Sequence, residues 1–92
     1  MNKAQDISFG NGERCTLELD SAAARPSSDP ELTVSTYPVR GLNRGELSIL
    51  VTRTQAPAIV RVDVLDRATQ LTRDELEQIR HRAEAIFRSE SQ

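Results

Sequence analysis

The sequence predicts an α+β fold: a mainly antiparallel sheet of about five strands, with one C-terminal amphipathic helix packed on one face. Apolar residues alternate with polar ones between Ile7 and Leu65, which indicates strands. Near the C-terminus the apolar spacing changes to three and four, which indicates a helix. A chain of 92 residues has room for one modest core, so residues 1–92 are expected to form a single domain.

The first two strands are predicted to form a hairpin. Ile7 and Phe9 precede a Gly-Asn-Gly turn, and Cys15, Leu17 and Leu19 alternate with polar residues after it. A two-residue turn would place a polar residue opposite Cys15. A three-residue loop places Ile7 opposite Cys15 and keeps the apolar partners on one face, so it is favoured.

A flexible connection is predicted at residues 20–30, because prolines, serines and alanines there show no apolar period. A three-stranded meander follows, with three alternating sets: Leu32, Val34 and Thr36; Leu47, Ile49 and Val51; and Val60, Val62 and Val64. A loop at 38–45 would place Val34 opposite Ile49, and a four-residue loop at 54–57 would place Val51 opposite Val60. These registers put the apolar partners on one face.

The start of the helix is marked by a capping box. Thr72 can accept a hydrogen bond from the backbone of Glu75, whose carboxylate can reach back to the Thr72 backbone. Leu71 and Leu76 can form a hydrophobic staple around this cap. The residues that share one stripe of the helix are Leu76, Ile79, Ala83, Ile86 and Phe87.

Composition argues against several classes of function. Twelve basic and fourteen acidic residues give a net charge of -2, so nucleic acid is not expected to be a partner. Residues 1–12 lack the apolar stretch of a secretory signal, and no segment reaches the roughly 20 apolar residues of a membrane span. A cytoplasmic protein that does not bind membranes is the expectation. The single cysteine excludes a disulfide within the chain.

No catalytic, metal or cofactor site is predicted. Cys15 and His81 are the only thiol and the only imidazole, so a nucleophile and its base would have to be these two. Cys15 is expected to point into the core, whereas His81 lies on the far side of the helix from the apolar stripe. One cysteine and one histidine also fall short of the ligands of a structural zinc site. The chain is therefore not expected to be an enzyme.

The leading functional hypothesis is a protein-protein interaction module, such as an adaptor, inhibitor or chaperone-like protein, or a homodimer. It depends on the sheet face opposite the helix, where the predicted registers place Tyr37, Leu50, Ile59 and Leu65. Contiguous exposed apolar area often marks a partner site. Two explanations involve no partner. The first hairpin or the connection covers this face, or its apolar residues are exposed one by one without forming a continuous patch.

An anion-binding or nucleic-acid-binding module is the alternative function. Arg40 and Arg44 lie in the long predicted loop at 38–45 together with two glycines. Guanidinium groups suit phosphate or carboxylate, and glycines allow an anion to approach the backbone. An ordinary solvated loop explains the same residues, because short basic patterns discriminate weakly.

Overall fold

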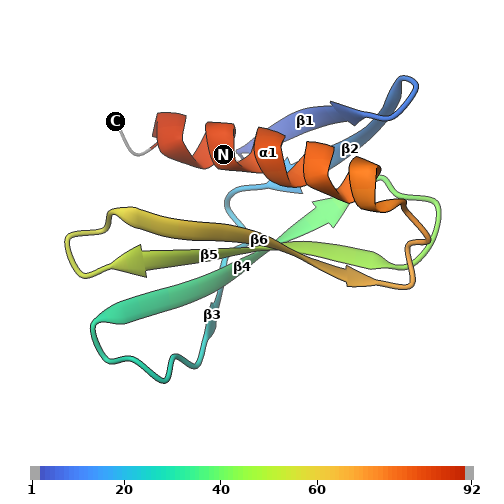
Figure 1. The fold of residues 1–92 in the computed structure, drawn as a ribbon. Coiled ribbons are helices and arrows are strands. Elements are labelled where there is room, and N and C mark those ends of the chain that lie inside the picture. Colours follow the sequence, from blue (N-terminus) through green and yellow to red (C-terminus); the bar gives the residue numbers. More distant parts are fainter. Residues whose placement is uncertain (1–2, 91–92) are drawn as a thin grey trace.

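The computed structural model describes residues 3–90, so the predicted domain 1–92 extends beyond the described range at both ends. Six strands precede one helix along the chain (Figure 1). Their bounds are β1 Ala4–Phe9, β2 Glu13–Glu18, β3 Ala23–Arg25, β4 Leu32–Arg40, β5 Glu46–Thr54, β6 Ile59–Arg67 and α1 Arg73–Glu90. The α+β class is confirmed, with six strands instead of five.

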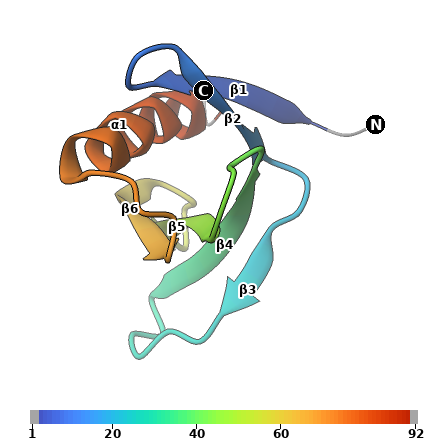
Figure 2. The same ribbon diagram turned by 90° about the vertical axis from the view of Figure 1, so that its right-hand side faces the viewer.

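All strands pair antiparallel in one sheet, in the order β1-β2-β4-β5-β6, and β3 lies beside β4. The sheet bends so that the β1–β2 hairpin lies on one side of α1 and β4, β5 and β6 lie on the other (Figure 2). The helix contacts both β1 and β6, the two end strands of this order. It therefore closes a curved sheet on its concave side.

The core fills the space between the curved sheet and α1. Ile79, Ala83 and Phe87 of the predicted helix stripe are buried, and Leu76 and Ile86 pack partly buried against them. The sheet contributes Ile7, Phe9, Cys15, Leu17, Tyr37, Val39, Leu47, Ile49, Val51 and Val62. The expectation that one helix stripe covers one sheet face is confirmed.

The hairpin register and the helix cap agree with the sequence. Ile7 lies opposite Cys15 across a three-residue loop. The Glu75 backbone N–H donates to Thr72 Oγ1 at 3.1 Å, and the Thr72 N–H donates to Glu75 Oε1 at 2.9 Å. The hairpin tip then docks on the start of the helix, because the Gly10 N–H donates to Gln78 Oε1 at 2.9 Å.

The predicted register between β4 and β5 is wrong. β4 continues through Pro38 to Arg40, so Tyr37, not Val34, lies opposite Ile49. The loop is five residues long instead of eight, which shifts the pairing by three. Because neighbouring residues of a strand point to opposite faces, an odd shift exchanges the two faces of β4. Tyr37 and Val39 enter the core, and Val34 moves to the opposite face.

The predicted register between β5 and β6 is also wrong, by two residues. Val51 lies opposite Val62, not Val60, and a bulge interrupts the pairing next to the turn. An even shift keeps the faces, so Val62 is buried as expected. Between the turn and the bulge, however, Ile59 pairs with Arg53 on the covered face. Val60 is the extra residue and is exposed.

The predicted connection at 20–30 contains a short strand that the sequence did not indicate. β3 pairs with the first half of β4, from Ala23 opposite Thr36 to Arg25 opposite Val34. Its three side chains are all exposed, so no apolar period marks it. The connection runs along the sheet edge rather than across the uncovered face.

Two loops meet where β6 leads into α1. A Cβ at Gly45, which has φ +71°, would clash with the backbone of Arg67 and Ala68. Ala68 and Gln70 both have a φ of 62°, and the Arg44 side chain donates to the Gln70 side-chain oxygen. The β4–β5 loop therefore holds this turn through a close backbone approach.

Replacing Thr72 with alanine should lower the free energy of unfolding by about 0.5 to 2 kcal/mol, because one half of the capping box is lost. Thr72→Ser keeps the hydroxyl and should change stability much less. Chemical denaturation of both variants measures the difference. Equal losses in the two variants would show that the hydroxyl does not cap the helix.

Replacing Gly45 with alanine should be more harmful than replacing Gly12. Both glycines have positive φ, but a Cβ at Gly12 meets no atom within 4 Å. Gly12→Ala should therefore cost about 1 to 2 kcal/mol through backbone conformation alone. Gly45→Ala should cost about 1 to 3 kcal/mol more. The added Cβ would meet the backbone of Arg67 and Ala68, which cannot move aside as the end of a flexible side chain can. Equal denaturation midpoints for the two variants would contradict the close approach of Gly45 to the backbone of Arg67 and Ala68.

Candidate functional site

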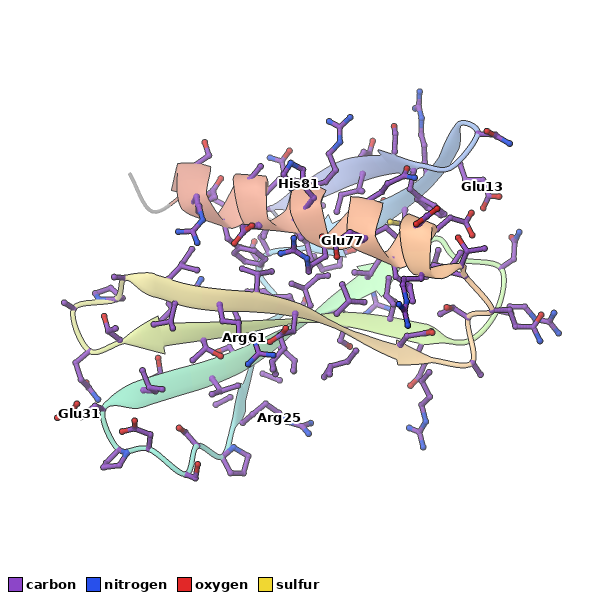
Figure 3. The ribbon with its side chains drawn as sticks, in the orientation of Figure 1. Glu13, Arg25, Glu31, Arg61, Glu77 and His81 are labelled. Carbon is purple, nitrogen blue, oxygen red and sulfur yellow. The ribbon has the colours of Figure 1, made fainter. Side chains whose placement is uncertain are left out.

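The sheet face that α1 leaves uncovered is the largest candidate surface. Its side chains come from alternate residues of four strands and are arranged in rows by the observed pairing. The three central rows are Arg25, Val34, Thr52 and Arg61; Ala23, Thr36, Leu50 and Asp63; and Pro38, Ser48 and Leu65. Arg25 and Arg61 lie on the side of the sheet away from α1 in Figure 3. The rows define the outer face.

Apolar residues converge at the centre of the outer face. Leu50 occupies the middle row, and Val34, Pro38 and Leu65 are its diagonal neighbours on the two adjacent strands. Diagonal neighbours in a sheet are about 7 to 8 Å apart, within reach of large side chains. Leu65 is 42 % exposed, and the other three are half-buried. We call these four residues the outer patch.

Polar and charged side chains border the outer patch. Leu50 lies directly between Thr36 and Asp63. Arg61 Nε is 2.8 Å from Asp63 Oδ2, so the border at β6 carries a pair of opposite charges. The apolar centre is thus bounded by groups that remain hydrated.

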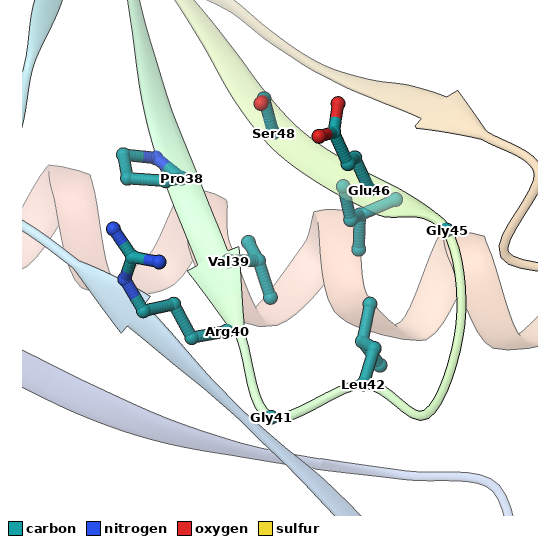
Figure 4. A pocket seen from close by; sticks show the side chains of 9 residues that line it. Pro38, Val39, Arg40, Gly41, Leu42, Gly45, Glu46 and Ser48 are labelled. Carbon is teal, nitrogen blue, oxygen red and sulfur yellow. The ribbon is translucent and has the colours of Figure 1, made fainter.

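A hollow of about 440 Å³ adjoins the outer patch at the tip of the β4–β5 hairpin (Figure 4). Pro38 and Arg40 line it from β4, and Glu46 and Ser48 line it from β5. Arg40 Nε is 3.7 Å from Glu18 Oε1, across the neighbouring strand pair. The lining also includes the apolar side chains of Val39, Leu42 and Leu47, so the hollow has both polar and apolar walls beside the outer face.

Two of the four residues predicted for partner binding lie on the outer face. Leu50 and Leu65 are brought together there. The placement of Tyr37 is wrong, because the odd register shift turns its ring into the core, where it is 7 % exposed. The placement of Ile59 is also wrong, because the bulge turns it toward the core, against which it packs half-buried.

The Tyr37 side chain has a structural role in the core, where it contacts Phe87 and Arg53. Its ring centroid is 4.7 Å from that of Phe87, and its hydroxyl accepts a 3.1 Å hydrogen bond from Arg53 Nη1. The Arg53 guanidinium carbon also lies 5.8 Å from the Tyr37 centroid and 5.7 Å from the Phe87 centroid. These contacts close one end of the core with a cation over two rings.

Val34 and Pro38 are outer-patch residues that the sequence analysis missed. Pro38 suggested the end of a strand, since proline cannot donate a ladder hydrogen bond. In the structure β3 pairs with β4 at residues 34–36 and β2 pairs with it at 39–40, so Pro38 falls in the gap between them. A gap of this kind tolerates proline, but only the complete strand order reveals it.

The two arginines of the alternative function do not share a site. Arg40 faces Glu18 on β2, on one side of the β4–β5 hairpin. Arg44 donates to Gln70 in the connection after β6, on the other side. Each guanidinium group already has a protein partner, and the two partners lie on opposite sides of the hairpin.

Cys15 and His81 are likewise separated. Cys15 is 2 % exposed in the core, and His81 is exposed on α1 (Figure 3). Within residues 3–90, no group of three or more His, Cys, Asp or Glu side chains could hold a metal ion. In the same range, no helix combines the length and apolar character needed to cross a bilayer.

The flank of α1 that carries most charge is internally paired. Arg80 is 2.6 Å from Glu77 and 3.4 Å from Glu84, and Arg88 is 3.1 Å from Glu84. The hydrogen bond from Arg80 lowers the pKa of Glu77, and the hydrogen bond from Arg88 lowers the pKa of Glu84. We call these four residues the helix flank. Its positive and negative charges are equal in number.

Comparisons with protein-family models, with curated protein sequences and with solved structures give no match for this chain. The outer patch and the surfaces around it therefore carry the functional argument.

Alkaline pH should destabilise the protein through Cys15. Burial, together with the charge of Asp6, raises the pKa of this thiol from 9.0 to about 11. The folded state then holds the proton more tightly, so stability is complete below pH 9 and is lost as the pH rises toward 11. Between these values the loss should reach at most about 3 kcal/mol.

Thermal unfolding between pH 8 and pH 11 tests this loss, with Cys15→Ala as the control. The variant keeps all other titrating groups, so its melting temperature should fall less than that of the parent protein. Parallel curves would show that the thiol does not ionise on unfolding in this range.

Proposed function

We propose that this chain is a non-enzymatic protein-interaction module that binds a partner protein through the outer patch. The observation that carries the proposal is the convergence of Val34, Pro38, Leu50 and Leu65 on a sheet face that the helix does not cover. Antiparallel sheets usually turn a polar face toward water. An apolar centre on that face therefore favours a role in binding a partner protein.

The arrangement of the outer face supports protein binding over other uses. Protein interfaces combine an apolar centre with a hydrated polar rim. Here Thr36, Thr52 and the Arg61–Asp63 pair surround the apolar centre. The adjoining hollow offers Glu46 and Ser48 as polar contacts for side chains at the partner's periphery.

The anion-binding alternative has less support. A phosphate or carboxylate ligand gains most from guanidinium groups that converge on it. Arg40 and Arg44 instead contact Glu18 and Gln70 on opposite sides of their hairpin. The separation of Cys15 from His81 similarly supports a non-enzymatic role.

Site-specific photocrosslinking in cells tests the proposed interface. A photoreactive residue in place of Leu65 should crosslink one defined protein, whereas the same residue in place of Ala85, exposed on α1, should not. Adding Leu50→Lys should reduce the Leu65 crosslink at least about tenfold, because a charge would be buried in the centre of the contact.

The circular dichroism spectrum of each variant provides the folding control. Crosslinking that is equal at positions 65 and 85, or that survives Leu50→Lys in a folded protein, would exclude the outer patch as the binding site.

A further inference from the structure

The last strand of the sheet, β6, has one paired and one unpaired edge. It pairs with β5, and no strand of residues 3–90 pairs with its other side. In Figure 1 this outer edge faces the viewer, with α1 above it and no ribbon in front of it. The backbone N–H and C=O groups along an unpaired edge form a template for another strand.

The protection of β6 as an edge strand comes mainly from charge, because Arg61, Asp63, Asp66 and Arg67 lie along it. It is nine residues long and contains neither proline nor lysine. The bulge disturbs only its first residues, and residues 61–67 pair regularly with β5. By contrast, the edge strand β3 has three residues. The outer edge of β6 is therefore a long and regular pairing site.

We propose that two copies of this chain pair antiparallel through β6, with Val62 opposite Val62 of the second copy. A twofold axis perpendicular to the sheet relates such copies. In this register Arg61 faces Asp63 of the second copy, and Asp63 faces Arg61 of the second copy. Because Arg61 and Asp63 also pair within each chain at 2.8 Å, the four charges alternate in sign around the axis.

The neighbouring registers are less favourable. Centring the pair on Asp63 brings two Asp63 carboxylates together, and centring it on Val64 brings Arg61 against Arg67. Like charges directly opposite each other destabilise a strand pair. Centring on Leu65 also avoids this repulsion, because Asp63 then faces Arg67, and it overlaps the five residues 63–67. Centring on Val62 overlaps the seven residues 59–65, of which residues 59 and 60 adjoin the bulge. The charge pattern of β6 thus disfavours the two intermediate registers and leaves those centred on Val62 and on Leu65.

The proposed pairing also shields exposed apolar surface. Val60 is 51 % exposed, the highest value among the large apolar residues of the described chain. In the register centred on Val62, it lies next to Val64 of the second copy. Removing Val60 from water supplies a hydrophobic contribution that salt does not screen.

The helix flank fits the same arrangement. Gln78 bonds to the β1–β2 hairpin and so marks the flank of α1 that faces β1. At 100° per residue, Arg80 and Glu84 lie on the opposite flank, above β6. The twofold axis places both helices on the same side of the joined sheet, so the two helix flanks face each other. Their paired charges sum to zero and do not repel.

Charge reversal in analytical ultracentrifugation tests the pairing. The parent protein should shift from 10.2 kDa toward twice that mass as concentration rises to about 1 mM. Arg61→Asp alone and Asp63→Arg alone should each weaken dimerisation about tenfold, since every substitution acts twice in a symmetric pair. The double variant Arg61→Asp/Asp63→Arg restores opposite charges across the axis and should dimerise within about threefold of the parent.

Cysteine crosslinking tests the register. Arg61→Cys and Asp63→Cys chains, mixed under oxidation, should form a disulfide between the two variants, because opposite residues are about 4.5 to 5.5 Å apart between Cα atoms. Neither variant alone should crosslink, and Cys15 is buried and should not take part. Leu50→Lys, on the outer face, should leave dimerisation unchanged and so separates this proposal from the proposed function.

Three results would overturn the proposal. The first is a protein that stays monomeric at about 1 mM. The second is a dimer that Arg61→Asp and Asp63→Arg do not weaken in folded protein, or that the double variant does not restore. The third is self-crosslinking of a Leu65→Cys chain in preference to the mixed pair, which would move the register.

Discussion

The packing of α1 between the two end strands of the sheet is the interaction on which the fold depends. The β1–β2 hairpin joins the rest of the sheet through only two residue pairs, both with β4. Backbone pairing alone therefore cannot fix its angle. Ile79, Ala83 and Phe87 provide the shared surface that buries the hairpin on one side and β4, β5 and β6 on the other. The Gly10–Gln78 hydrogen bond anchors the hairpin tip to the same helix. The curvature of the sheet, and so the existence of an uncovered convex face, follows from this packing.

Features determined by residues close together in the chain could be predicted from the sequence. The capping box needs only Thr72 and Glu75, and the hairpin register needs only the loop between Ile7 and Cys15. The register of β4 with β5 could not be predicted in this way. β4 contains two competing alternating sets, one with Val34 and one with Tyr37. Tyr37 prevails in the core because it packs against Phe87, fifty residues later in the chain. That contact exists only after the helix has docked.

The same long-range contact determines which residues form the candidate site. With Tyr37 in the core, Val34 and Pro38 move to the outer face beside Leu50, so the outer patch is more continuous than the sequence analysis expected. Leu50 and Leu65 were placed correctly because the error between β5 and β6 was an even number of residues, which preserves the faces. Ile59 was misplaced because a bulge adds one residue to a strand without a clear sequence signal. Face assignments thus depend on whether a register error is odd or even.

The two proposed surfaces reinforce each other through symmetry. A twofold axis perpendicular to the sheet keeps the outer face of both copies on the same side, so pairing through β6 would place two outer patches on one continuous sheet. The Arg61–Asp63 pairs would then form the seam between them instead of a solvated border. A partner that contacts both patches would bind the second at a high effective concentration, so modest affinity at each patch would suffice for tight overall binding. A weak edge pairing could in turn be stabilised by such a partner, because binding to the dimer alone shifts the equilibrium toward it. The paired chains would thereby present a larger binding surface than one chain does.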